Sequence, residues 1–199
     1  MPGIVVVPCE RLPRWLENFE TRHGPYELGG SLVATASDGA TATFTGPFGQ
    51  PVPAVPFDPP EVPWGLLLVR RGGFAVAAGT SSTPTHTKVG RRHVQGKTKA
   101  GGWSQQRYAR RRDNQAREAF EAAADHAHRL LVVERPVDVL VCGGDRAAVD
   151  AVLADRRLQG LVDKVTPPWL AVPDPTSGVL KAAVADAWSC RVEVVEPHP

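Results

Sequence analysis

The chain has 199 residues, of which 42% are hydrophobic and 22% charged, with a formal net charge of +2. Such a chain can bury roughly 70% of the surface that its unfolded form exposes, so we expect one core and one domain over residues 1–199. Its three cysteines are odd in number, widely spaced and without a C-x-x-C pair, so the sequence supports neither a disulfide framework nor a zinc knuckle. With no apolar run near the ~18 residues of a membrane span, we expect a cytoplasmic monomer without membrane, metal or cofactor.

Turn signals and apolar periodicity divide the chain into short elements. Asp38-Gly39 is the strongest short hairpin signal, and Gly72-Gly73 marks a second hairpin. Seven prolines within residues 46–64 predict an irregular connection at the surface. In chain order, we expect a helix over 12–19, strands over 31–37, 40–45, 65–71, 74–79 and 84–94, a long helix over 104–132, a strand over 137–141, a helix over 145–158, a strand over 169–172, a helix over 177–188 and a strand over 191–195.

The order of these elements indicates an α/β fold. Strands that alternate with helices after residue 132 imply a parallel or mixed β-sheet flanked by helices, which we expect to be continuous in space. Asp145 follows Gly143-Gly144 and suits a helix N-cap. We interpret this turn as structural, because it lacks both the third glycine of a dinucleotide fingerprint and the Gly-Lys-Ser/Thr of a P-loop.

A basic segment from Lys88 to Arg112 dominates the charge distribution. It holds nine Lys or Arg residues and no acid, whereas the rest of the chain has fourteen basic against twenty-one acidic residues. Such self-repulsion is costly unless an anion is bound, so the pattern favours nucleic acid over a merely solvated surface. The candidate cationic contacts are Lys88, Arg91, Arg92, Lys97, Lys99, Arg107, Arg110 and Arg111.

RNA fits this segment better than duplex DNA. Nothing in the sequence resembles a helix-turn-helix recognition helix, whereas Trp103 and Tyr108 offer stacking faces for unpaired bases. Arg107, Arg110 and Arg111 lie one helical turn apart and would form one cationic edge. We therefore expect a single-stranded or irregular RNA as the partner.

The chemistry of the basic segment is restricted by the residues it lacks. His93 is its only side chain that titrates near neutrality, so a carboxylate pair, a Ser-His-Asp triad or a metal cluster cannot be assembled from the segment itself. Any catalysis by the segment must therefore come from positioning. A glutamine amide and its backbone N–H can orient a water molecule and stabilise an oxyanion.

The motif at the tip of this segment resembles a known family. Gly101-Gly102, then Ser104-Gln105 and the helix start Arg-Tyr-Ala-Arg-Arg-Arg over 107–112, are similar to the catalytic middle domain of eukaryotic and archaeal class I release factors. They resemble more closely the Vms-like release factors, in particular an actinobacterial-type member, whose tip is Gly-x-x-Gln. The resemblance implies a domain of release-factor middle-domain type, with a protruding Gly-rich catalytic loop at 95–104 that leads into the long helix.

The resemblance implies a peptidyl-tRNA hydrolase that releases nascent peptides on stalled large ribosomal subunits, with rRNA at the peptidyl-transferase centre as a partner. An ungapped alignment places the release-factor glutamine on Trp103, whereas the Gly-x-x-Gln pattern selects Gln105 and leaves Gln106 in reserve. The catalytic candidates are therefore Gln105 and Gln106, with Gly101 and Gly102 giving the tip its reach. Two alternatives stay open: cleavage of the tRNA near its 3′ CCA end, and a non-catalytic RNA-binding module.

Overall fold

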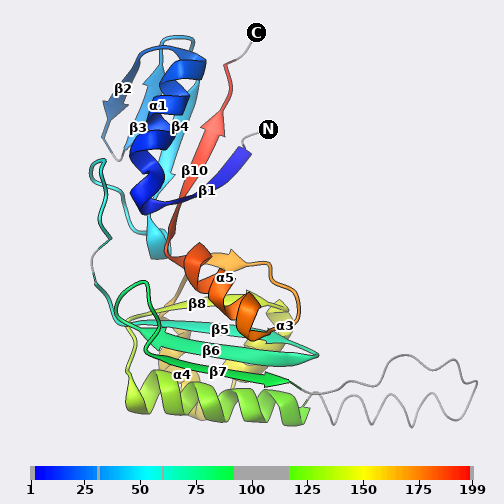
Figure 1. Cartoon of the computed structure of the whole chain (residues 1–199). Coiled ribbons are helices and arrows are strands. Elements are labelled where there is room, and N and C mark those ends of the chain that lie inside the picture. The colour runs from blue at the N-terminus through cyan, green and yellow to red at the C-terminus, as the bar shows by residue number, and fades with distance from the viewer. Residues whose placement is uncertain (1–2, 31, 60, 92–116, 198–199) are drawn as a thin grey trace, which may run out of the picture. The chain divides into compact units, whose positions relative to one another are not determined.

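The computed structural model describes residues 3–30, 32–59, 61–91 and 117–197. The chain divides into two compact units, the first formed by residues 1–61 with 185–199 and the second by residues 62–184. Each unit has its own five-stranded sheet and its own hydrophobic cluster (Figure 1). The expectation of one core and one continuous sheet is therefore wrong.

The first unit is an antiparallel sheet with one helix against it (Figure 1). Its strand order is β1-β10-β4-β3-β2, and every neighbouring pair is antiparallel. Because β10 lies between β1 and β4, the end of the chain completes a sheet that its beginning starts. The elements are β1 (Gly3–Pro8), α1 (Leu12–His23), β2 (Tyr26–Gly29), β3 (Val33–Ala36), β4 (Thr41–Thr45) and β10 (Ser189–Val195).

The first predicted hairpin forms between β3 and β4. Gly39 has a φ of +92° and its N–H donates to the Ala36 carbonyl at 3.0 Å, while Asp38 Oδ1 accepts from the Ala40 N–H at 2.9 Å. Within this described turn Gly39 alone has a positive φ, so it is not the type I′ turn that the Asp-Gly pair indicated. The aspartate acts as an acceptor that closes the turn.

Asp38 also joins this hairpin to the end of α1. His23 is buried, and its Nδ1 lies 2.9 Å from Asp38 Oδ2. The Ala40 N–H and then the His23 hydrogen bond hold the pKa of the Asp38 carboxyl below its usual range. A lowered folded-state pKa means that this stabilisation is present above the unfolded pKa of about 3.9 and disappears as the pH falls through the folded one.

Asp38→Asn should therefore make the stability of the protein depend less on pH in the acid range. At neutral pH the variant should melt below the wild type, because an amide oxygen accepts more weakly from Ala40 and His23 than a carboxylate does. Thermal unfolding followed from pH 7 into the acid range below about pH 4 should show the two melting temperatures converging. A difference that stays constant with pH would contradict this assignment.

The predicted proline-rich connection follows β4. It begins with the 3-10 turn η2 (Pro47–Gly49), and Pro51 then forms an isolated bridge to Thr45. The side chains of Phe48 and Val52 are buried. Part of the connection thus packs into the first unit, although we expected it to lie on the surface.

The second unit contains a mixed sheet, which confirms the predicted α/β class. Its strand order is β7-β6-β5-β8-β9, in which β5, β8 and β9 pair in parallel and β6 pairs antiparallel with both β5 and β7. The elements are β5 (Trp64–Arg70), β6 (Gly73–Gly79), β7 (His86–Arg91), β8 (Val139–Gly144), α3 (Arg146–Leu153), α4 (Gln159–Val162), β9 (Val165–Leu170) and α5 (Ser177–Ala187).

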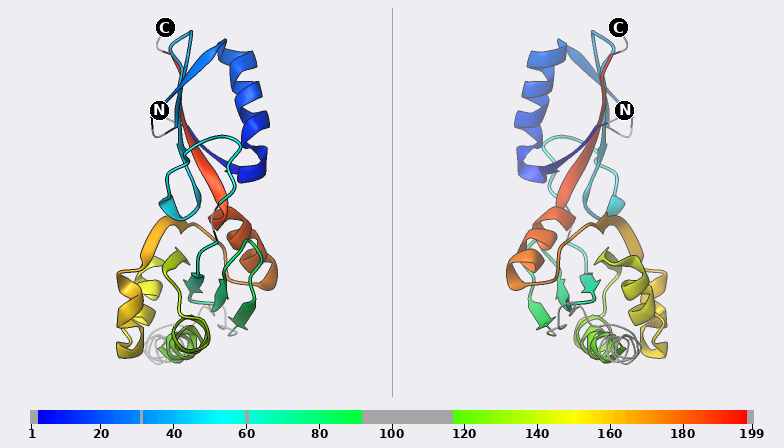
Figure 2. Two further views of the ribbon diagram at one scale, coloured as in Figure 1. Left: turned by 90° about the vertical axis from the view of Figure 1, so that its left-hand side faces the viewer. Right: turned by 90° about the vertical axis from the view of Figure 1, so that its right-hand side faces the viewer.

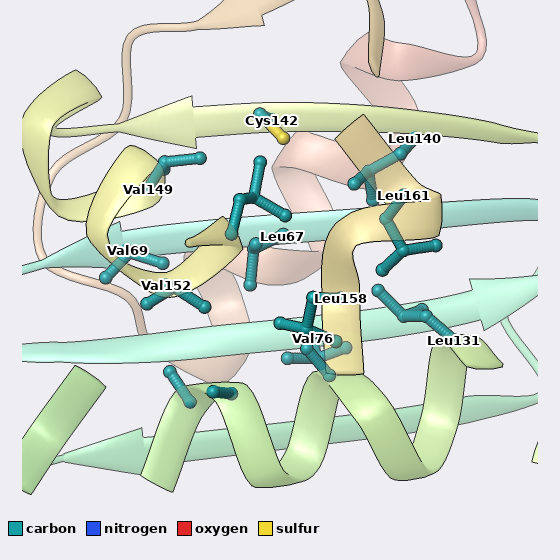
Figure 3. Packing of buried hydrophobic residues seen from close by; sticks show 14 of the residues in the cluster. Leu67, Val69, Val76, Leu131, Leu140, Cys142, Val149, Val152, Leu158 and Leu161 are labelled. Carbon is teal, nitrogen blue, oxygen red and sulfur yellow. The ribbon is translucent and has the colours of Figure 1, made fainter. Parts of the chain in front are cut away.

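Helices cover both faces of this sheet (Figures 1 and 2). On one face lies α5, and on the other lie α3, α4 and a helix over residues 117–128 that continues into the π-helical turn η3 (Arg129–Glu134). Side chains from α3, α4 and the helix that continues into η3 close over β5, β6 and β8 to form the larger hydrophobic core (Figure 3). The start of the predicted long helix, at residue 104, lies outside the described residues.

The three cysteines are free and buried. Cys9 and Cys190 lie far apart in sequence, yet their Sγ atoms are 3.0 Å apart because β1 and β10 are neighbours in the first sheet. In the second unit, burial raises the pKa of Cys142 to about 12. This thiol is therefore protonated at neutral pH and is a poor nucleophile.

Candidate nucleic-acid interface

One edge of the second sheet gathers the ends of four strands. Strands β5, β7, β8 and β9 run in the same direction, and the registers pair Gly73 with both Arg70 and Arg91, and Gly143 with Leu170. The carboxyl ends of these four strands therefore share one edge (Figure 1). Open α/β sheets usually bind their ligands at this edge. The basic segment begins in β7, whose last residue, Arg91, lies at this edge.

Two of the predicted RNA-binding residues lie on β7. Lys88 is exposed, and Arg91 is the last residue of the strand. The other predicted site residues lie outside the described part of the chain, so the structure does not report how they are arranged. These are Arg92, Lys97, Lys99, Gly101, Gly102, Trp103, Gln105, Gln106, Arg107, Tyr108, Arg110 and Arg111.

Lys88 lies near a histidine of the helix over residues 117–128. The ring of His126, on that helix, stacks on Phe74 of β6 at a centroid distance of 5.5 Å. Burial lowers the pKa of His126, and the charges of Lys88 and Arg129 lower it further. His126 is therefore neutral at physiological pH and packs against Phe74 as an aromatic ring.

The path of β7 toward the basic segment depends on a glycine. A Cβ atom at Gly90 would lie 2.3 Å from the ring of Phe74, which faces it across the β6–β7 ladder and is buried. Such a distance is impossible without moving the ring. Gly90 thus lets Phe74 fill the space between β7 and His126.

The Gly-Gly-Asp turn after β8 is structural, as the sequence indicated. A Cβ atom at Gly143 would lie 2.5 Å from the Leu170 carbonyl oxygen, and Gly144 has a φ of +94°. The Asp145 Oδ1 accepts from the Ala147 N–H at 3.1 Å, which caps α3. Gly143 allows strands β8 and β9 to approach closely, and the aspartate starts the helix.

The sequence interpretation missed three side chains at the same edge. The Arg146 guanidinium lies 4.2 Å from the centroid of the Trp169 ring. Arg70 donates through Nη1 to the Val172 carbonyl at 2.8 Å, and its Nε lies 3.4 Å from Asp174. Arg70 and Trp169 lie at the carboxyl ends of β5 and β9, and Arg146 closely follows the end of β8. The strand order that brings them together is not visible in the sequence.

Two other kinds of site were sought in the described part of the chain. No group of three or more His, Cys, Asp or Glu residues there could hold a metal ion. Nor does a helix within these residues have the length and apolar character required to cross a bilayer.

The fold and this edge define an α/β protein with a cationic segment at the carboxyl ends of its strands. The chain belongs to the Actinobacteria/chloroflexi VLRF1 release factor family, whose model matches residues 62–193. The match covers the whole of the second unit and extends into β10. No curated protein matches the chain. Family membership confirms the resemblance seen at the tip motif and gives the chain a translation-related role in ribosome rescue, which implies interaction with the ribosome.

Proposed function

We propose that the chain is a peptidyl-tRNA hydrolase that frees nascent peptides from tRNA on stalled large ribosomal subunits. The family match carries this proposal, because its residues 62–193 include the whole basic segment and the Gly-x-x-Gln pattern ending at Gln105. Release factors act on the ester that joins a peptide to tRNA. The segment begins in a strand at the ligand-binding edge of a sheet with helices on both faces, which gives it a rigid base.

The proposed reaction is the attack of water on the peptidyl ester. The water oxygen forms a bond to the acyl carbon, the bond to the ribose 3′ oxygen breaks, and a proton passes to that oxygen. Gln105 orients the water through its side-chain amide, and its backbone N–H stabilises the oxyanion. Because the segment lacks a carboxylate, the substrate's ribose hydroxyl and the ribosome supply the remaining groups.

The cations of the segment would hold the RNA while the tip acts. Lys88 is exposed on β7, and Arg107, Arg110 and Arg111 follow the tip closely in sequence. We propose that they contact rRNA near the peptidyl-transferase centre and the tRNA acceptor end. In this proposal both compact units work together as one cytoplasmic, monomeric release-factor-like domain, with residues 95–104 as its catalytic loop.

A release assay tests the proposal. Purified protein is added to large subunits that carry a labelled peptidyl-tRNA, and the loss of peptidyl-tRNA is followed with time. We expect release that depends on protein concentration. If the protein binds these subunits but leaves the peptidyl-tRNA intact, the proposal fails, and the chain is a non-catalytic RNA-binding module.

A further inference from the structure

Arg146 is held over an aromatic ring at the edge where the basic segment begins. Its guanidinium lies 4.2 Å from the centroid of Trp169, a half-buried residue of β9 that packs against the larger core. Arg146 itself is exposed. A guanidinium that lies over a ring keeps N–H groups of its rim available for a phosphate, and the contact with the ring restricts its orientation.

The position of Arg146 is unfavourable for the helix that carries it. Arg146 is the first residue of α3, and the first turn of this helix holds no acid. A cation at a helix N-terminus opposes the macrodipole. The neighbouring Asp145 carboxylate already accepts from the backbone of Ala147. Helix stability therefore does not account for an arginine at this position.

Arg146 has an aromatic partner, whereas four other arginines of the second unit have carboxylate partners. These four lie within 4 Å of carboxylates: Arg70 with Asp174, Arg117 with Glu121, Arg129 with Glu134, and Arg157 with Asp125 and Asp155. Within the described residues, the contact found for Arg146 is instead the Trp169 ring. A cation whose charge is not matched by a carboxylate is suited to bind an external anion.

Arg146 and Trp169 lie at the same edge of the sheet as the start of the basic segment. Strand β8, which ends just before Arg146, lies three strand spacings from β7, or about 14 Å. Arg70, the last residue of β5, lies between these two strands. Its Cγ lies 3.0 Å from the point that a Cβ atom on Gly144 would occupy. Its guanidinium contacts Val172 and Asp174, which follow β9. Arg70 thereby fixes the end of the strand that presents Trp169.

We propose that Arg146, supported by Trp169, binds a phosphate of the ribosomal RNA and extends the RNA-binding surface beyond the basic segment. This inference rests on the proposed function, in which the segment itself holds RNA. Arg146 acts as the phosphate contact, and Trp169 orients its guanidinium. Arg70 acts as a positioning residue for the end of β9.

Equilibrium binding to two probes, protein-free large-subunit rRNA and intact large subunits, tests the inference at several salt concentrations. Arg146→Gln should weaken binding to both probes about five- to tenfold near 0.1 M salt and reduce the salt slope by ~0.7, the effect of one lost phosphate contact. Trp169→Leu should weaken binding in the same direction. The matched control is Arg135→Gln, which removes the same charge from an exposed position just before β8, at the opposite edge.

The outcomes separate this inference from the proposed function. If Arg146→Gln binds RNA with wild-type affinity and salt slope while variants of the basic segment bind more weakly, the inference is overturned. If the Arg146 variant and the basic-segment variants all bind as the wild type does, the RNA-binding proposal itself fails. Weakening on intact subunits alone would identify an acidic protein contact and overturn the RNA assignment. Arg146→Lys keeps the charge and should retain the salt slope, which separates a phosphate contact from a loss of folding.

Discussion

Replacing Gln105 with alanine should slow peptide release from stalled large subunits by about 10²–10³, the usual cost of removing one oriented hydrogen-bonding group from an active site. The variant loses the side-chain amide that orients the water and keeps the backbone N–H that stabilises the oxyanion. The basic segment contains no carboxylate, so no acid in the segment can replace the lost amide. Binding to the subunit should stay near the wild-type value, because the side chain at the tip contributes little to affinity. Release rates under single-turnover conditions, measured together with subunit binding, separate these two effects.

Gln106→Ala is the matched control for this variant, since it removes the same amide one residue later. A large loss with Gln106→Ala and a small loss with Gln105→Ala would show that the second glutamine acts. A small loss with either variant would identify the backbone N–H as the principal donor. Wild-type release by both single variants and by the double variant would show that the glutamine mechanism is wrong.

Neutralising Arg107, Arg110 and Arg111 together should weaken binding to large subunits by about 10² near 0.1 M salt. The estimate follows from three phosphate contacts, each of which contributes ~0.7 to the slope of affinity against salt on single-stranded RNA. The slope should therefore fall by about 2. Replacement by glutamine preserves the helix propensity of this region, so the loss reports charge rather than folding.

A triple variant elsewhere provides the control for that charge. Arg14 and Arg22 of α1 and Arg135, which follows η3, are all exposed, and their replacement by glutamine removes the same three charges. This control should bind nearly as the wild type does. Equal weakening in the two triple variants would indicate that only net charge matters, and the assignment of a local RNA contact would then fail.

Local signals predicted most of the second unit. The hairpin at Gly72-Gly73 and the cap at Asp145 were predicted correctly because backbone geometry dictates those residue types. The single helix expected over 145–158 is in fact broken, because Asp155 caps a new turn by accepting from the Arg157 N–H. Strand β9 was misplaced because Pro167 and Pro168 discouraged a strand there, although an edge strand tolerates proline.

The first unit was harder to predict because its sheet is completed by the far end of the chain. Strand β1 was not predicted, since its short apolar run gains its pairing only from β10, more than 180 residues later. Strand β2, with the sequence Tyr-Glu-Leu-Gly, is too short for periodicity to register. These long-range pairings produced a second sheet where one continuous sheet was expected.

One part of the candidate site could be predicted from the sequence and another part could not. The basic segment and its tip were found from composition and motif, which are properties of neighbouring residues. Arg146 and Trp169 are separated by 22 intervening residues and meet only because β8 and β9 are parallel neighbours. No local pattern marks such a pair. The order of the strands is needed to identify it.

The length of the tRNA 3′ end after peptide release tests the central claim most directly. Stalled large subunits carrying peptidyl-tRNA labelled near its 3′ end are incubated with the protein, and the tRNA product is resolved at single-nucleotide resolution. Hydrolysis of the ester predicts a full-length tRNA with an intact CCA end and a free peptide. A tRNA shortened at its CCA end, with nucleotides still attached to the released peptide, would contradict peptidyl-tRNA hydrolysis and establish a nuclease instead.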